Sequence, residues 1–94
     1  MSKLAKVRVY FPNELFARDA VARMRYRLNR VDRDHDLLLL DVYQVRKVRS
    51  RPAIEIWFWP EPEDEEATRQ LAWLLACRAQ TLAGVTASFI AYDV

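Results

Sequence analysis

The spacing of apolar residues changes along the chain, and the order of these changes restricts the possible folds. Alternating apolar and polar residues indicate half-buried strands, whereas apolar residues repeated every three or four positions indicate amphipathic helices. We predict strands over 6–11, 37–48, the stretch 54–60 and 85–94, and helices over 14–30 and from the acidic segment 60–66 to about residue 83.

Three local signals support these boundaries. Asn13 precedes the first helix and is a suitable N-cap. The segment 49–52, "RSRP", predicts a turn that joins the second and third strands into a hairpin. Gly84 is the only glycine of the chain, and it stands where the second helix needs a left-handed C-terminal residue. Trp73 lies off the apolar stripe of that helix, and we expect it to pack against the first helix.

The predicted order of elements leads to one fold class. With right-handed crossovers, it predicts an α+β, ferredoxin-like βαββαβ fold, with a four-stranded antiparallel sheet in the order 4-1-3-2 and two helices on one face. The 94 residues make a single domain, 1–94.

The stretch 54–60, "IEIWFWP", raises the question of what covers its tryptophans. If the helices cover Ile54, Ile56 and Phe58, the tryptophans lie on the opposite face of the sheet. A contiguous aromatic patch there indicates an interface. Our candidate partner-binding residues on this face are Arg8, Tyr10, Tyr43, Trp57, Trp59 and Tyr92, with Ile90 beside them.

Basic residues are concentrated in the first half of the chain. Residues 1–52 carry 13 Lys/Arg against 6 Asp/Glu (+7), and residues 53–94 carry 2 against 7 (−5), which gives the net charge of +2. We expect two basic surfaces that could meet an acidic partner. They are the β-hairpin with Arg46, Lys47, Arg49 and Arg51, and a stripe on the first helix with Arg23, Arg27 and Arg30.

The sequence contains no catalytic signature. A chain with one glycine has no phosphate-binding loop or dinucleotide fingerprint. The acidic residues around His35 resemble the start of a calcium loop, but Leu37 stands where that loop needs glycine. Cys77 has no second cysteine to pair with. We therefore predict no catalytic residue, no metal, no cofactor and no small-molecule substrate, in a cytoplasmic protein that does not bind membranes.

Two functions compete for the aromatic face. The first is a non-enzymatic module that binds a protein partner or forms a homodimer, as an adaptor, inhibitor or subunit. The second is binding of single-stranded nucleic acid, because the layout is similar in topology to an RNA-recognition motif, which stacks bases on aromatic residues of strands one and three. The third strand here, "RPAIEIWFWP", departs from that motif because it has no glycine and contains Glu55.

Overall fold

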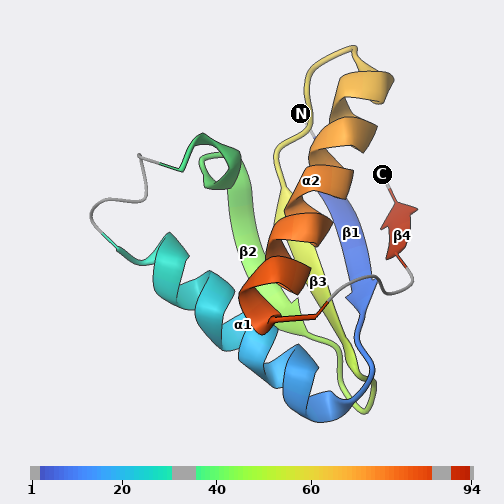
Figure 1. Cartoon of the computed structure of the whole chain (residues 1–94). Helices are drawn as coiled ribbons and strands as arrows, with labels where there is room; N and C mark the ends of the chain where they lie inside the picture. Colours follow the sequence, from blue (N-terminus) through green and yellow to red (C-terminus); the bar gives the residue numbers. More distant parts are fainter. Residues whose placement is uncertain (1–2, 31–35, 86–89, 94) are drawn as a thin grey trace.

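Two helices pack on one side of an antiparallel sheet (Figure 1). The computed structural model describes residues 3–30, 36–85 and 90–93. In chain order, the elements are β1 (Ala5–Tyr10), α1 (Glu14–Leu28), the short 3-10 helix η2 (Leu37–Leu39), β2 (Val42–Lys47), β3 (Ala53–Phe58), α2 (Glu65–Ala83) and β4 (Ile90–Asp93).

The pairing of β1 with β3 forms the centre of the sheet. These strands are antiparallel over their whole length, beginning with Ala5 opposite Phe58. β2 pairs antiparallel with β3, with an irregularity between Val42 and Gln44. The hydrogen-bonded order is β2-β3-β1-β4, so β2 is an edge strand.

The structure corrects the predicted ferredoxin-like fold of four full strands. Its six-residue strands form a three-stranded antiparallel sheet, β1-β3-β2, and these strands and the two helices follow the order β-α-β-β-α. Of the predicted strand 85–94, the described part of the chain contains only the four residues of β4, beside Lys6 to Val9 of β1. Val85 does not begin a strand, because its N–H donates to the carbonyl of Gln80 at 3.0 Å in the helix cap.

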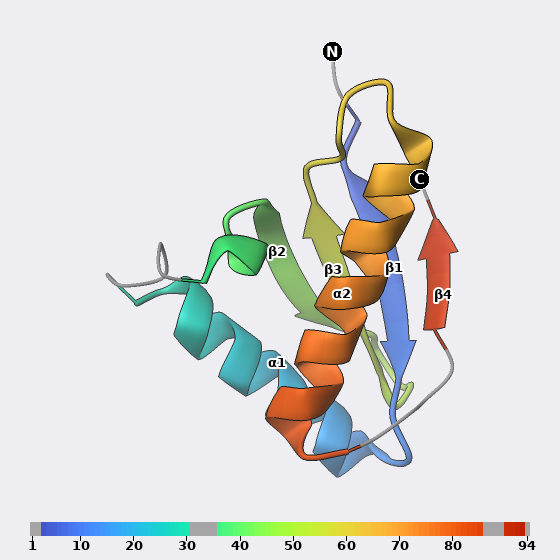
Figure 2. The ribbon, with the colours of Figure 1, turned by 45° about the horizontal axis from the view of Figure 1, so that its top comes forward.

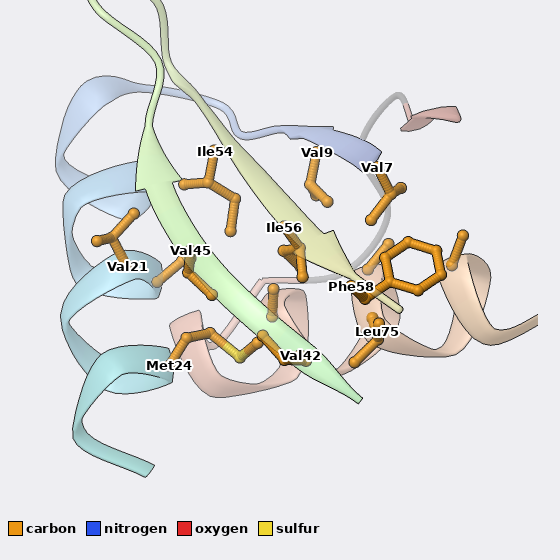
Figure 3. Close-up of a cluster of buried hydrophobic side chains, with 14 of the residues drawn as sticks. Val7, Val9, Val21, Met24, Val42, Val45, Ile54, Ile56, Phe58 and Leu75 are labelled. Atoms are coloured by element: carbon orange, nitrogen blue, oxygen red, sulfur yellow. The ribbon is translucent and has the colours of Figure 1, made fainter. Parts of the chain in front are cut away.

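The hydrophobic core lies between the sheet and the helices. As predicted, Val7, Val9, Ile54, Ile56 and Phe58 are completely buried, and they point toward the helix layer (Figure 3). The helices contribute small residues and a few large ones, which allows close packing on the sheet. The buried residues of this layer include Ala17, Ala20, Val21 and Met24 of α1 and Ala72, Leu75, Ala76 and Ala79 of α2.

Helix α1 begins at the predicted cap. Asn13 Oδ1 accepts a hydrogen bond from the backbone N–H of Phe16 at 3.1 Å, which satisfies a donor that the helix itself leaves unpaired. Toward its C-terminus, Arg25 Nε donates to the carbonyl of Val45 at 3.1 Å. This hydrogen bond ties α1 to the edge strand β2.

The predicted strand over 37–48 is wrong in its first half. Residues Leu37–Leu39 form η2, in which the N–H of Leu39 donates to the carbonyl of Asp36 at 2.9 Å. Leu39 is completely buried, whereas Leu37 and Leu40 are exposed. Four consecutive leucines contain no alternation, so their hydrophobicity does not distinguish a strand from a helical turn.

Helix α2 has the predicted C-terminal cap, and of its predicted inward face Leu75 and Ala79 are completely buried. Gly84 has φ 75°, and its N–H together with that of Val85 forms a Schellman motif with the last carbonyls of the helix. Leu71 and Leu82, also predicted to face inward, are half-buried and pack against the edge of the core. Trp73 is 59% exposed, so the expectation that it packs against α1 is wrong.

Candidate binding surface

The sheet has one face that no helix covers, because both helices lie on the other side (Figure 2). The burial of β1 alternates strictly between buried and half-buried residues, so every second residue lies on the uncovered side. We call this surface the open face. Its members are Lys6, Arg8 and Tyr10 of β1, Gln44 and Arg46 of β2, and Glu55 and Trp57 of β3.

A carboxylate organises the centre of the open face. Glu55 Oε2 lies 2.7 Å from Arg8 Nη2 and 3.6 Å from Lys6 Nζ. Burial alone would raise the pKa of Glu55, but the hydrogen bond from Arg8 and the charges of Lys6 and Arg8 outweigh it and hold this pKa below its ordinary value. Hydrogen bonds to Tyr10 and Glu55 raise the pKa of Arg8. The face is therefore charged and ordered by ion pairs.

Trp57 lies in contact with two cations. Lys6 Nζ is 5.2 Å and the Arg46 guanidinium carbon 5.7 Å from its ring centroid, which are cation–π distances. The Trp57 Nε1 atom is buried and has no hydrogen-bond partner within the described residues. The predicted position of Trp57 on the open face is confirmed, but the two cations restrict access to its ring.

The aromatic pair consists of Tyr43 and Trp59. The two ring centroids are 5.9 Å apart with planes at 80°, an edge-to-face contact. Tyr43 is 58% and Trp59 45% exposed. They meet where β2 begins and β3 has just ended, and the backbone N–H of Trp59 is fixed by the carbonyl of Asp41 at 2.8 Å. Two of the predicted residues thus form an exposed apolar surface at the end of the sheet.

The four residues of the predicted basic hairpin lie in three different places. Arg46 lies on the open face beside Trp57. Lys47 points to the helix layer, where its Nζ is 2.9 Å from Glu14 Oε2 and also donates to the carbonyls of Val48 and Arg51. Arg49 and Arg51 are exposed in the turn. Lys47 therefore holds the turn in place, and two arginines remain at its tip.

The predicted arginine stripe of α1 does not join the open face. It lies in the helix layer, where Arg23 pairs with Asp19 at 3.0 Å and Arg30 donates to the Tyr26 hydroxyl at 2.7 Å. A hollow of ≈ 390 Å³ lies beside this stripe, between α1 and the end of α2. Its lining residues are Asp19, Ala22, Arg23, Tyr26, Arg27 and Leu82.

Tyr92 belongs to β4, where the backbone register is known. It pairs with Val7, a residue of the covered face, and Ile90 pairs with Val9. The side chains of β4 are not described, so our definition of the open face leaves out Tyr92 and Ile90. The calcium-like segment around His35 also lies outside the described residues.

Other chemistry is limited in the described part of the chain. Asp36 forms an ion pair with Arg78, and Cys77 is half-buried. Residues 3–30, 36–85 and 90–93 contain no group of three His, Cys, Asp or Glu side chains that could hold a metal ion. Among these residues there is also no helix with the length and apolar character that crossing a membrane requires.

The candidate binding residues predicted from the sequence left out three members of the open face, Lys6, Gln44 and Glu55. Glu55 alternates with Ile54 and Ile56, so its position on this face was clear from the sequence. Lys6 alternates with Arg8 and Tyr10, so the same pattern that selected those residues could have found it. Gln44 could not be found in this way, because the irregularity after Val42 shifts the register of β2. Comparison with known proteins adds no identification, since no family model, no curated protein and no solved structure matches this chain.

Proposed function

We propose that this chain is a small non-enzymatic module that binds a protein partner through the open face and the adjoining Tyr43–Trp59 pair. The exposure of this aromatic pair carries the proposal. Tyrosine and tryptophan bury roughly 150–250 Å² each in an interface, and about half of each residue is still accessible here. Covering the pair would remove roughly 200 Å² from water, worth up to about 5 kcal/mol before the cost of association.

The charges of the open face indicate the chemistry of the partner. Lys6, Arg8 and Arg46 contribute three positive charges and Glu55 one negative charge, so the face has a net charge of +2. A complementary surface would place an apolar residue against the aromatic pair and carboxylates beside Lys6 and Arg46. A cytoplasmic location, in which Cys77 stays reduced, completes the proposal.

Binding of single-stranded nucleic acid is the alternative. The presence of cations beside aromatic rings favours this alternative, because cations attract the phosphate backbone and bases stack on aromatic rings. The contacts of Trp57 oppose it, because a base that stacked on this ring would compete with Lys6 and Arg46. We therefore rank a protein partner first.

The test removes the aromatic pair with Tyr43→Ser and Trp59→Ser. The matched control is Trp73→Ser, which removes a tryptophan of α2 that is more exposed than Trp59. We expect the double variant to fold, by circular dichroism, and to lose at least about tenfold in affinity for a partner purified on the wild-type chain, because interface aromatics are frequent hot spots. The control should keep the wild-type affinity.

Three results would contradict the proposal. In the first, the double variant binds the purified partner as tightly as the wild type does. In the second, the variant is unfolded, which would make the aromatic pair part of the core. In the third, a fluorescent oligouridylate binds the wild type and does not bind the double variant. In the same result, light scattering shows that the wild type is a monomer, and no protein partner is retained on the wild-type chain. That third result supports the alternative function.

A further inference from the structure

The two ends of the sheet carry opposite charge. The turn between β2 and β3 lies at one end of the molecule, and the segment that leads from β3 into α2 lies at the other (Figure 1). The six residues of β3 separate the two segments by roughly 20 Å, at about 3.3 Å per residue. This separation exceeds the Debye length of about 8 Å at physiological salt. The two ends therefore do not neutralise each other within one molecule.

The basic end is built around the hairpin turn. Arg49 and Arg51 are exposed and have no ion-pair partner in the described part of the chain, and Lys47 and Arg18 share the single carboxylate of Glu14. These five residues give a net charge of +3. The hydrogen bonds from Lys47 to the carbonyls of Val48 and Arg51 fix the turn, so the two free arginines project from an ordered tip.

The acidic end surrounds the start of α2. It contains Glu61, Glu63, Asp64, Glu65 and Glu66, all exposed. Arg69 pairs with Glu65 at 3.4 Å and with Glu66 at 3.3 Å, and Lys3 lies nearby. The net charge of these seven residues is −3. Within the described residues, Glu61 and Glu63 have no ion-pair partner.

A hollow at the acidic end gives it a shape that complements the tip. The hollow has a volume of ≈ 640 Å³ and combines apolar proline surface with carboxylates. An arginine side chain suits such a site, because its stem can contact the prolines while its guanidinium meets the carboxylates. The lining residues are Lys3, Pro60, Glu61, Pro62, Glu63, Asp64, Glu65 and Thr68.

We infer that the occupant of this hollow is the basic tip of a second copy of the chain, so that copies associate head to tail. The two ends are opposite in sign and equal in the magnitude of their charge, the hollow can receive an arginine side chain, and each copy carries one basic and one acidic end. Such a contact is heterologous, and it leads to a ring or to an open chain. The inference goes beyond the proposed function, since it uses the hairpin tip and the acidic end, and neither belongs to the open face or to the Tyr43–Trp59 pair.

The test neutralises one end at a time. Variant A carries Arg49→Gln and Arg51→Gln, and variant B carries Glu61→Gln and Glu63→Gln. We expect the wild type to form dimers and longer species in about 50 mM salt and to lose them in about 500 mM salt, because the contact is electrostatic. Each variant alone should be monomeric by light scattering. An equimolar mixture of A and B should form dimers and nothing longer, since A keeps only its acidic end and B only its basic end.

The control variant carries Arg23→Gln and Arg27→Gln. It loses the same charge as variant A from the surface of α1, and it should associate like the wild type. A wild type that stays monomeric at about 1 mM in low salt, or a mixture of A and B that stays monomeric, would overturn the inference. The inference would also be overturned if variants A and B still associated while the double variant Tyr43→Ser, Trp59→Ser was monomeric. That last pattern would support the open face as a self-association surface instead.

Discussion

The covered face and the open face of the sheet alternate along the same strands, yet they are stabilised in opposite ways. On the covered face, Val7, Ile56 and their neighbours are completely buried and make only apolar contacts with the helices. On the open face, half-buried side chains are held by ion pairs and cation–π contacts around Glu55 and Trp57. The comparison teaches that one face determines stability, whereas the other can change its surface chemistry at little cost to the fold.

The largest expected effect comes from the covered face. Ile56→Ala leaves a cavity between β3 and the helices, and such substitutions of fully buried residues cost about 2–5 kcal/mol. We expect the free energy of unfolding, measured with urea, to fall by this amount. A loss below about 1 kcal/mol would mean that the core under β3 is loosely packed, and the contrast between the faces would fail.

The neighbouring residue on the open face should matter less. Trp57→Ala removes a larger side chain than Ile56→Ala does, but Trp57 is only half-buried. Its Nε1 atom is buried and has no hydrogen-bond partner among the described residues. Loss of that unsatisfied donor offsets part of the lost contact with Lys6 and Arg46. We expect a cost of about 1 kcal/mol, measured by the same urea titration. A cost equal to that of Ile56→Ala would show that the open face is a second core.

The smallest effect concerns Glu55 and depends on pH. Because its folded-state pKa lies below the ordinary value of 4.5, Glu55 contributes stability that is complete above that pH and is lost as the pH falls through the folded-state pKa. We expect Glu55→Gln to cost less than about 1 kcal/mol at pH 7, since the ion pair with Arg8 is partly exposed. Urea titrations at pH 7 and pH 3 should show the difference between variant and wild type shrinking at pH 3. A constant difference would exclude this ion pair as its cause.

The sequence predicted the parts of the fold that depend on local chemistry. The alternation of apolar and polar residues identified the covered residues of β1 and β3. Asn13, through its side chain, predicted the start of α1, and Gly84, through its backbone freedom, predicted the end of α2. The strand predictions failed for the four leucines at 37–40, where apolar and polar residues do not alternate. They also failed at residue 85, whose N–H donates to a carbonyl of α2 in the helix cap. Those outcomes depend on contacts made after the chain has folded.

The candidate site was predictable to a lesser degree. Trp57, Arg8 and Tyr10 followed from alternation, and the structure places them on one face. Tyr43, which contacts Trp59, lies at the irregularity in β2. The register after that irregularity pairs Lys47 with Ile54 of the covered face, and Lys47 then meets Glu14 of α1. Both are tertiary effects, which explains why the predicted hairpin of four basic residues has only two at its tip.

The hydrogen bond from Arg25 to the carbonyl of Val45 determines how another chain can approach the sheet. β2 is an edge strand, and a free edge invites β-augmentation, in which a foreign strand pairs with the exposed backbone. Arg25 already occupies an acceptor there, and the irregularity beside Val42 interrupts the regular spacing that an added strand would need. The β2 edge is therefore a poor template for an added strand, so a chain that approached this edge would have to contact side chains rather than the free backbone.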